Sequence, residues 1–188
     1  MSEKIRTFIA IELPEKILTP IRQLQGHLRD YGFKIRWVPP TNIHLTLKFL
    51  GDIDTSQTEK IGHAILESVK AYEPLSLGAK GIGVFPDLKR PRVVWVGVCG
   101  MVDPLIKLQQ NLQDNLDLIG FPKEKRRFNA HLTLGRIKTK IPRERLRDAI
   151  QKYQSFQTEA FIADRITLFK SDLKPSGAIY TRLKHIPI

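Results

Sequence analysis

Apolar and polar positions along the chain follow two different periods, and each period predicts a kind of secondary structure. Residues 6–12 are rich in β-branched and aromatic side chains, which is typical of a strand. Residues 14–31 place apolar side chains three or four positions apart, which is the spacing of a helix with one buried face. Pro20 lies inside this stretch, so we expect the helix to start or kink there.

The remaining segments continue this pattern. Ser56 and Glu59 have the spacing of a capping box and predict the start of a helix that runs towards Tyr72. Further strands are predicted over residues 35–38, 43–51, 75–84 and 92–98. In the second half, helices are predicted over residues 103–118 and 142–153, and strands over residues 128–137, 161–169 and 179–183. No linker divides the chain, so we expect one bilobal domain over residues 1–188, of the α+β class.

One tetrapeptide occurs twice, once in each half. His44-Leu45-Thr46-Leu47 is repeated letter for letter as His131-Leu132-Thr133-Leu134, and both copies lie in predicted strands. Such a repeat favours a duplicated lobe. Because side chains alternate between the faces of a strand, each copy presents a histidine and a threonine on one face and two leucines on the other. We expect the leucines, with Ile43 and Phe49, to be buried beneath the helices.

Two such faces, related by a pseudo-two-fold axis, would form a cleft suited to phosphodiester hydrolysis. Histidine titrates near neutrality, so one ring can take a proton from water while the other gives one to the leaving oxygen. The hydroxyls of Thr46 and Thr133 can donate hydrogen bonds to the non-bridging phosphate oxygens. This chemistry requires no metal ion and no other cofactor. The alternative is a structural repeat without chemistry, although leucine alone would serve that purpose.

Composition indicates which kind of molecule the protein binds and where in the cell it is found. The 31 Lys and Arg against 19 Asp and Glu give a net charge of +12, which favours a polyanionic partner such as RNA. A charge bias that serves solubility or thermal stability is the alternative. The single cysteine excludes an internal disulfide and a thiolate metal cluster. No apolar stretch is long enough for a membrane span or a secretory signal, so we expect a cytoplasmic protein without a membrane partner.

The chain resembles a known family, the 2H phosphoesterases, which are named for two His-x-Thr-x motifs. Within that family it looks most like the RNA 2′,3′-cyclic phosphodiesterases, historically also called 2′-5′ RNA ligases. The segments that carry the resemblance span nearly the whole chain and cover residues 6–11, 36–40, 44–51, 83–86 and 131–136.

The resemblance implies two pseudo-symmetric lobes, each an antiparallel sheet covered by helices, with a central cleft. It also implies conversion of a 2′,3′-cyclic phosphate at an RNA end, such as that of a tRNA fragment, to a 2′-phosphate. In similar proteins the first-motif histidine is the proton donor and the second-motif histidine the acceptor, which gives these roles to His44 and His131. We expect the protein to act as a monomer.

Lys48 and Arg136 are further candidates for substrate contacts. Lys48 shares the face of His44 by parity and can reach the phosphate or the RNA backbone, with a solvated lysine at the rim as the alternative. Arg136 would face away from His131 in a regular strand, but a bulge at Gly135 would turn it back towards the substrate.

Basic and aromatic residues near the motifs have two interpretations each. The run 123–127 (Lys-Glu-Lys-Arg-Arg) can border bound RNA or form a solvated loop. Trp37 and Phe8 can stack on a base. We prefer core packing for both rings.

Three other activities fit part of the sequence. Ligation of a cyclic phosphate end to a 5′-hydroxyl would run the same site in reverse. A non-catalytic RNA-binding module would explain the charge but not the paired His-Thr motifs. A metallohydrolase is disfavoured, because each motif strand carries a single histidine without a second ligand beside it.

Overall fold

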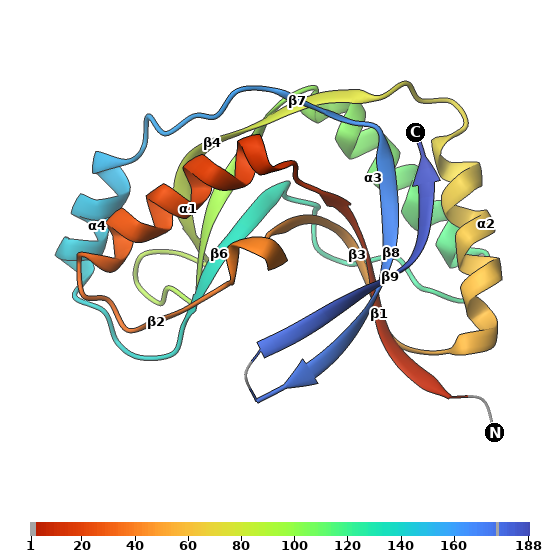
Figure 1. Ribbon diagram of the computed structural model, residues 1–188, viewed down its shortest axis with the longest axis horizontal. Coiled ribbons are helices and arrows are strands. Elements are labelled where there is room, and N and C mark those ends of the chain that lie inside the picture. Colours follow the sequence, from red (N-terminus) through yellow and green to blue (C-terminus); the bar gives the residue numbers. More distant parts are fainter. Residues whose placement is uncertain (1–2, 176) are drawn as a thin grey trace.

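One antiparallel sheet curls through the centre of the molecule (Figure 1). The computed structural model describes residues 3–175 and 177–188. Across these residues the sheet has nine strands. Eight of them follow the order β7-β4-β5-β6-β3-β1-β8-β9, and β2 pairs with β6. The strands are β1 (Lys4–Glu12), β2 (Ile35–Trp37), β3 (His44–Asp54), β4 (Leu75–Phe85), β5 (Val93–Gly100), β6 (His131–Ile137), β7 (Phe161–Ala163), β8 (Arg165–Lys174) and β9 (Gly177–Pro187).

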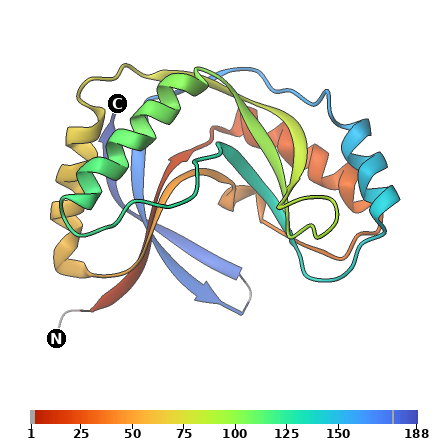
Figure 2. The ribbon, with the colours of Figure 1, turned by 180° about the vertical axis from the view of Figure 1, so that it is seen from behind.

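The α-helices of the described residues cover the sheet in two pairs. They are α1 (Glu15–Arg29), α2 (Thr58–Val69), α3 (Val102–Asp117) and α4 (Arg143–Lys152), with two short 3-10 helices, η1 (Pro40–Asn42) and η2 (Thr55–Gln57). Helices α1 and α4 lie beside the half that contains β2, β4 and β6, whereas α2 and α3 lie beside β1, β3, β8 and β9 (Figure 1, Figure 2). Gln25 fixes α1 to its half of the sheet, because its Nε2 donates to the carbonyls of Val38 and Leu134, each at 2.9 Å.

The leucines of both tetrapeptides lie in the main hydrophobic core. Leu45, Leu47, Leu132 and Leu134 are each at most 2% exposed, and they share one cluster with buried residues of the helices. Burying one such side chain contributes about 2 kcal/mol. A shift of either strand by one residue would expose these leucines, so the register is strongly determined. The burial predicted for the leucines is confirmed.

The expected α+β class, with antiparallel strands and two helix-covered halves, is confirmed, and the two halves share one sheet. Strands β3 and β6 join the halves at the pair Leu45–Leu132. The single strand expected over residues 161–169 is wrong. It is two strands separated at Asp164, of which β7 pairs with β4 and β8 pairs with β1. The chain therefore crosses from one half to the other at this point.

The start of α2 also differs from the prediction. The capping box at Ser56 and Glu59 is wrong, because Asp54 and Gln57 form one around η2 and the amide of Asp54 donates to Gln57 Oε1 at 3.0 Å. The chain therefore makes one 3-10 turn before α2 begins. Pro20 lies within α1 and does not start it. None of the helices described is both long and apolar enough to cross a bilayer.

Candidate active site

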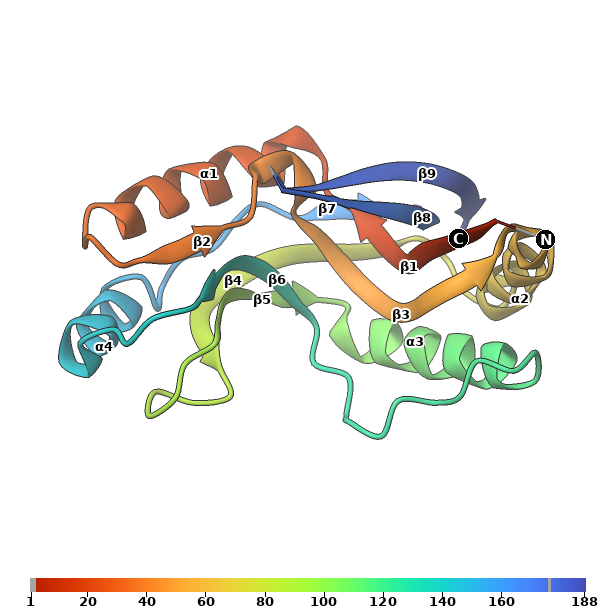
Figure 3. The ribbon, with the colours of Figure 1, turned by 90° about the horizontal axis from the view of Figure 1, so that it is seen from below.

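The two tetrapeptides lie on neighbouring strands in the middle of the sheet (Figure 3). Leu45 of β3 is the register partner of Leu132 of β6. Because the strands are antiparallel, the residues on either side of this pair oppose each other crosswise, so His44 faces Thr133 and Thr46 faces His131. The two motifs are thus related by a local two-fold axis, with all four polar side chains on the face opposite the buried leucines.

This register makes His44 and His131 diagonal neighbours across the strand pair. Diagonal positions on adjacent strands are about 7–8 Å apart, which long or aromatic side chains can span. A phosphate group placed between the two rings can therefore reach both. The register places the two histidines on one shared face of adjacent strands.

Each histidine is oriented by a backbone carbonyl two residues earlier in the chain. His44 Nδ1 lies 2.8 Å from the carbonyl oxygen of Asn42, and His131 Nδ1 lies 2.6 Å from that of Asn129. A carbonyl oxygen only accepts, so each Nδ1 carries a hydrogen and each Nε2 is left to exchange protons with a ligand. These contacts were not predicted, although an asparagine precedes each histidine by two residues and extends the repeat to Asn-x-His-Leu-Thr-Leu.

Aromatic rings hold both imidazoles in place. The ring of Phe8 stacks on His44 with centroids 4.7 Å apart, and Tyr180 meets the same imidazole edge-on at 5.4 Å. Phe85 meets His131 edge-on at 5.0 Å. Phe8 is 3% exposed, so the preference for core packing over base stacking is confirmed for this residue.

Burial of the His44 ring has an electrostatic consequence. It lowers the pKa of His44 from 6.5 to about 4, although the bond to the Asn42 carbonyl and the charge of Glu12 act in the opposite direction. His44 is therefore neutral near pH 7 in the protein without a ligand.

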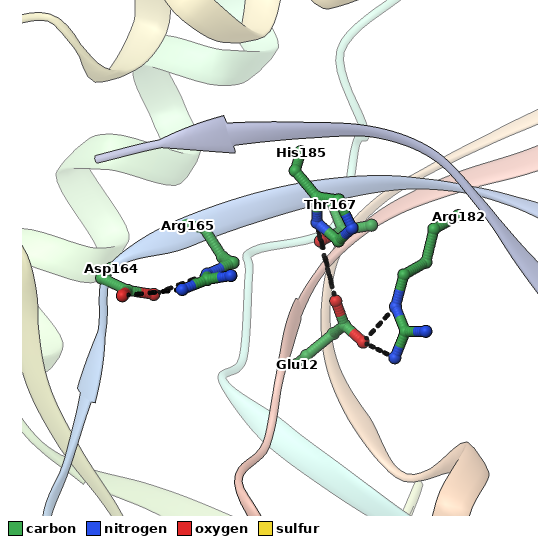
Figure 4. A network of polar contacts seen from close by, with 6 residues as sticks. All are labelled: Glu12, Asp164, Arg165, Thr167, Arg182 and His185. Carbon is green, nitrogen blue, oxygen red and sulfur yellow. Dashed lines mark hydrogen bonds and ion pairs between the residues drawn. The ribbon is translucent and has the colours of Figure 1, made fainter.

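Glu12, the register partner of His44 on β1, belongs to a polar network (Figure 4). Its Oε1 accepts from Arg182 Nε at 2.8 Å and Nη2 at 2.6 Å, and its Oε2 accepts from Thr167 Oγ1 at 3.1 Å. Burial acts to raise the pKa of Glu12, but these hydrogen bonds prevail and hold it below its usual value. Glu12, Arg182 and His44 border one cavity of about 370 Å³. No sequence pattern pointed to this network, because its members lie on three separate strands.

Thr46 and Thr133 are half-buried beside the histidines. In the described part of the chain, neither hydroxyl forms a hydrogen bond with another residue. Both hydroxyls are therefore available to a ligand, as the sequence analysis requires of them.

Lys48 does not join the site. The register between β1 and β3 skips Leu47, which places Lys48 opposite the core residue Ile9 rather than on the face of His44. Lys48 is 2% exposed, and its Nζ donates to Gln113 Oε1 at 3.2 Å and to the carbonyl of Pro122 at 2.7 Å. The expectation that Lys48 shares the face of His44 is wrong, and so is its alternative as a solvated lysine at the rim.

The same irregularity turns Phe49 to the opposite side. Its predicted burial is wrong, because Phe49 is 59% exposed and its ring lies 6.1 Å from that of Phe8. Phe49 is therefore an accessible aromatic surface on the face that carries His44.

An irregularity in β6 turns Arg136 to the face that carries His131, although the irregularity lies one residue before the position expected. The register between β5 and β6 pairs Gly135 with Val94 and Thr133 with Trp95, so the skipped residue is Leu134, one position before the expected Gly135. Arg136 is exposed. Because Leu134 is skipped, Arg136 lies on the face of β6 that carries His131 and Thr133.

Two further candidates, Trp37 and the run 123–127, have contacts of their own. Trp37 packs against the main core, with the guanidinium of Arg29 over its ring at 5.6 Å, so core packing is confirmed for this ring. In the run 123–127, Lys123 forms an ion pair with Asp114 of α3. Across residues 3–175 and 177–188, no group of three or more His, Cys, Asp or Glu is arranged to hold a metal ion.

Comparison with known proteins agrees with this geometry. A family model described as LigT-like phosphoesterase matches residues 11–95 and 98–180. The chain belongs to this family. One member, from Aquifex aeolicus and named RNA 2′,3′-cyclic phosphodiesterase, is 37% identical over 178 residues, which are 94% of each chain. Another of the same name, from Methanocaldococcus jannaschii, is 34% identical over 96% of this chain and 99% of its own.

Two solved structures share the whole fold of this chain. A Thermus thermophilus structure superimposes with a TM-score of 0.80 at 25% identity over 97% of both chains. Escherichia coli LigT complexed with 3′-AMP superimposes with a TM-score of 0.75 at 26% identity over 99% of both chains. The resemblance to 2H phosphoesterases seen in the sequence is confirmed.

Proposed function

We propose that this chain hydrolyses the 2′,3′-cyclic phosphate at an RNA end to a 2′-phosphate. The name of its relatives supports this substrate. The observation that carries the proposal is the crosswise pairing of two His-Thr motifs on one face of adjacent strands, with both Nε2 atoms free for proton transfer. Non-catalytic binding of RNA would need no such matched pair.

In this mechanism the two histidines act on opposite sides of one phosphorus atom. His131 Nε2 takes a proton from water as the water oxygen attacks phosphorus, and His44 Nε2 gives a proton to O3′ as the P–O3′ bond breaks. The bond from phosphorus to O2′ is retained, so the product carries a 2′-phosphate and a free 3′-hydroxyl. We assign donor and acceptor from the family resemblance.

The neighbouring groups stabilise the charge that develops on the phosphate. The hydroxyls of Thr46 and Thr133 donate to the non-bridging oxygens, and the guanidinium of Arg136 adds a fixed positive charge on the same side of the sheet. The carbonyls of Asn42 and Asn129 stabilise each ring when it is protonated, because they accept from Nδ1–H.

The lowered pKa of His44 must be reconciled with a donor role. In the protein without a ligand the ring is neutral near pH 7, whereas a donor carries a proton. A phosphodiester anion bound against the buried ring favours its protonated form, and so does the carboxylate of Glu12. We therefore infer that substrate binding raises the pKa of His44 and charges the donor only when the phosphate is in place.

The decisive experiment is incubation with an RNA that ends in a 2′,3′-cyclic phosphate, in the presence of a chelator. We expect a 2′-phosphomonoester, identified by chromatography against both isomers. Including a second RNA with a 5′-hydroxyl measures ligation in the same reaction. A 3′-phosphate product, or activity that EDTA abolishes and zinc or manganese restores, would contradict the mechanism.

A further inference from the structure

Three segments that are distant in the sequence meet at one end of the sheet, around Arg136. On one side, Arg36 of β2 is the register partner of Arg136. On the other side, Val93 of β5 is its partner, and the amide of Ile137 donates to the carbonyl of Arg92 at 2.8 Å. The start of β5, the end of β6 and Arg36 of β2 therefore lie side by side at this end of the sheet.

This surface carries a net positive charge, which the carboxylate of Asp87 offsets only in part. Its exposed cations, which we call the basic edge, are Arg36, Lys89, Arg90, Arg92, Arg136 and Lys138. In the described part of the chain, none of the six forms an ion pair or a side-chain hydrogen bond. The nearby carboxylate of Asp87 accepts from the backbone amides of Lys89 and Arg90 at 2.7 and 3.0 Å, so it shapes its own loop.

The pair Arg36–Arg136 is the most informative part of the basic edge. Register partners on antiparallel strands point to the same face, and like charges in such positions repel each other. In the free protein this arrangement is unfavourable. A bound anion between the two guanidinium groups would relieve the repulsion, and planar guanidinium groups match the geometry of phosphate oxygens.

The basic edge begins close to the catalytic motif. Arg136 follows Thr133 by three residues on β6, which corresponds to about 10 Å along a strand. The skipped residue Leu134 brings Arg136 to the site side of the sheet. Arg36 lies one strand further from His131, so the positive charge leads outward from the place where the cyclic phosphate would bind.

We infer that the basic edge holds the phosphodiester backbone of the RNA that leads to the cyclic end. A terminal cyclic phosphate has a chain on one side only, so that chain must leave the cleft along one surface. The basic edge is thus the part of the protein that distinguishes an oligoribonucleotide from a mononucleoside cyclic phosphate. This inference rests on the proposed function and extends it to the body of the substrate.

The test compares two substrates with the same reacting group. One is a mononucleoside 2′,3′-cyclic phosphate, and the other is an RNA of about ten nucleotides that ends in the same nucleoside cyclic phosphate. For the wild type we expect a higher kcat/KM with the RNA, and a preference that declines as salt increases. For Arg36→Gln/Arg92→Gln we expect about a tenfold loss with the RNA, a change of less than about twofold with the mononucleotide, and a salt slope smaller by about 0.7 per lost phosphate contact.

A matched control removes the same charge from another basic segment. Arg126→Gln/Arg127→Gln takes two arginines from the run 123–127, and it should keep the preference for the RNA. If this control loses the preference instead, or if Arg36→Gln/Arg92→Gln loses activity equally on both substrates at an unchanged unfolding midpoint, the inference is overturned.

The outcome for the proposed function is read separately. Wild-type protein that hydrolyses the mononucleotide without preferring the RNA would overturn the inference and leave the proposed function in place. If neither substrate is hydrolysed, the proposed function fails. In that case, fluorescence anisotropy with a labelled RNA that ends in a 2′-phosphate tests the inference without catalysis. Arg36→Gln/Arg92→Gln should bind this RNA more weakly than the wild type, and Arg126→Gln/Arg127→Gln should bind it as the wild type does.

Discussion

The lowered pKa of His44 should make the free energy of unfolding depend on pH, and this dependence can be measured. Burial lowers the pKa of its ring from 6.5 to about 4. We compare how acid changes the stability of the wild type and of His44→Gln, both without a ligand. His44→Gln cannot take up a proton at this position. In the unfolded chain the histidine binds a proton as the pH falls below 6.5, whereas in the folded protein it binds one only near about 4.

The free energy of unfolding therefore falls as the pH decreases through this window. One pKa unit corresponds to about 1.4 kcal/mol, so the complete loss would be about 3 kcal/mol. His44 is half-buried, and solvent screening reduces this figure. We expect the wild type to lose about 2 kcal/mol more than His44→Gln between about pH 7 and about pH 4.5, which is a large part of the stability of an ordinary domain.

Urea unfolding of both proteins at the two pH values measures this difference. Carboxylates with lowered pKa that do not act on His44, such as those of Asp87 and Asp164, also weaken the fold in acid, but their effect is common to both proteins and cancels. An NMR titration of the His44 ring proton gives the pKa directly. Equal acid sensitivity of the two proteins, or a His44 pKa of about 6.5 or higher without a ligand, would refute the reasoning. Adding a 2′-nucleotide should raise this pKa.

Three further outcomes follow from the site. His44→Asn and His131→Asn should each reduce kcat by about 10²–10⁴-fold while RNA binding, measured by anisotropy, is kept, and full activity in both would end the proposal. Thr46→Val and Thr133→Val should reduce kcat by less than the histidine variants, because water can replace one lost donor, and an equal or larger loss in steady-state assays would contradict this order. Lys48→Met should lower the unfolding midpoint and leave the pH optimum unchanged, and a shifted pH–rate profile would return Lys48 to the site.

The repeat made the centre of the fold predictable from the sequence. Two copies of His-Leu-Thr-Leu fix which side chains are buried, because leucines at alternate positions have a strong preference for one face. The neighbours of the histidines were not predictable in the same way. Phe8, Tyr180 and Glu12 meet His44 from strands that are joined to β3 only through the sheet, and sequence spacing carries no information about such contacts.

Lys48 and Arg136 show where the parity of a strand stops being informative. In a strand without irregularities, alternation of side chains would put Lys48 on the face of His44 and Arg136 on the face opposite His131. One skipped residue in each strand, Leu47 in β3 and Leu134 in β6, reverses both placements. In each strand the skipped residue is the last leucine of the repeated tetrapeptide. The irregularity therefore belongs to the duplicated unit, with the same physical effect in both halves: the strand is regular through the histidine and threonine and changes face directly after them. What differs is the side chains that follow. Four residues after the histidine, the first half has Lys48 in the core and the second half has Gly135, and one position later the exposed residue is Phe49 in the first half and Arg136 in the second.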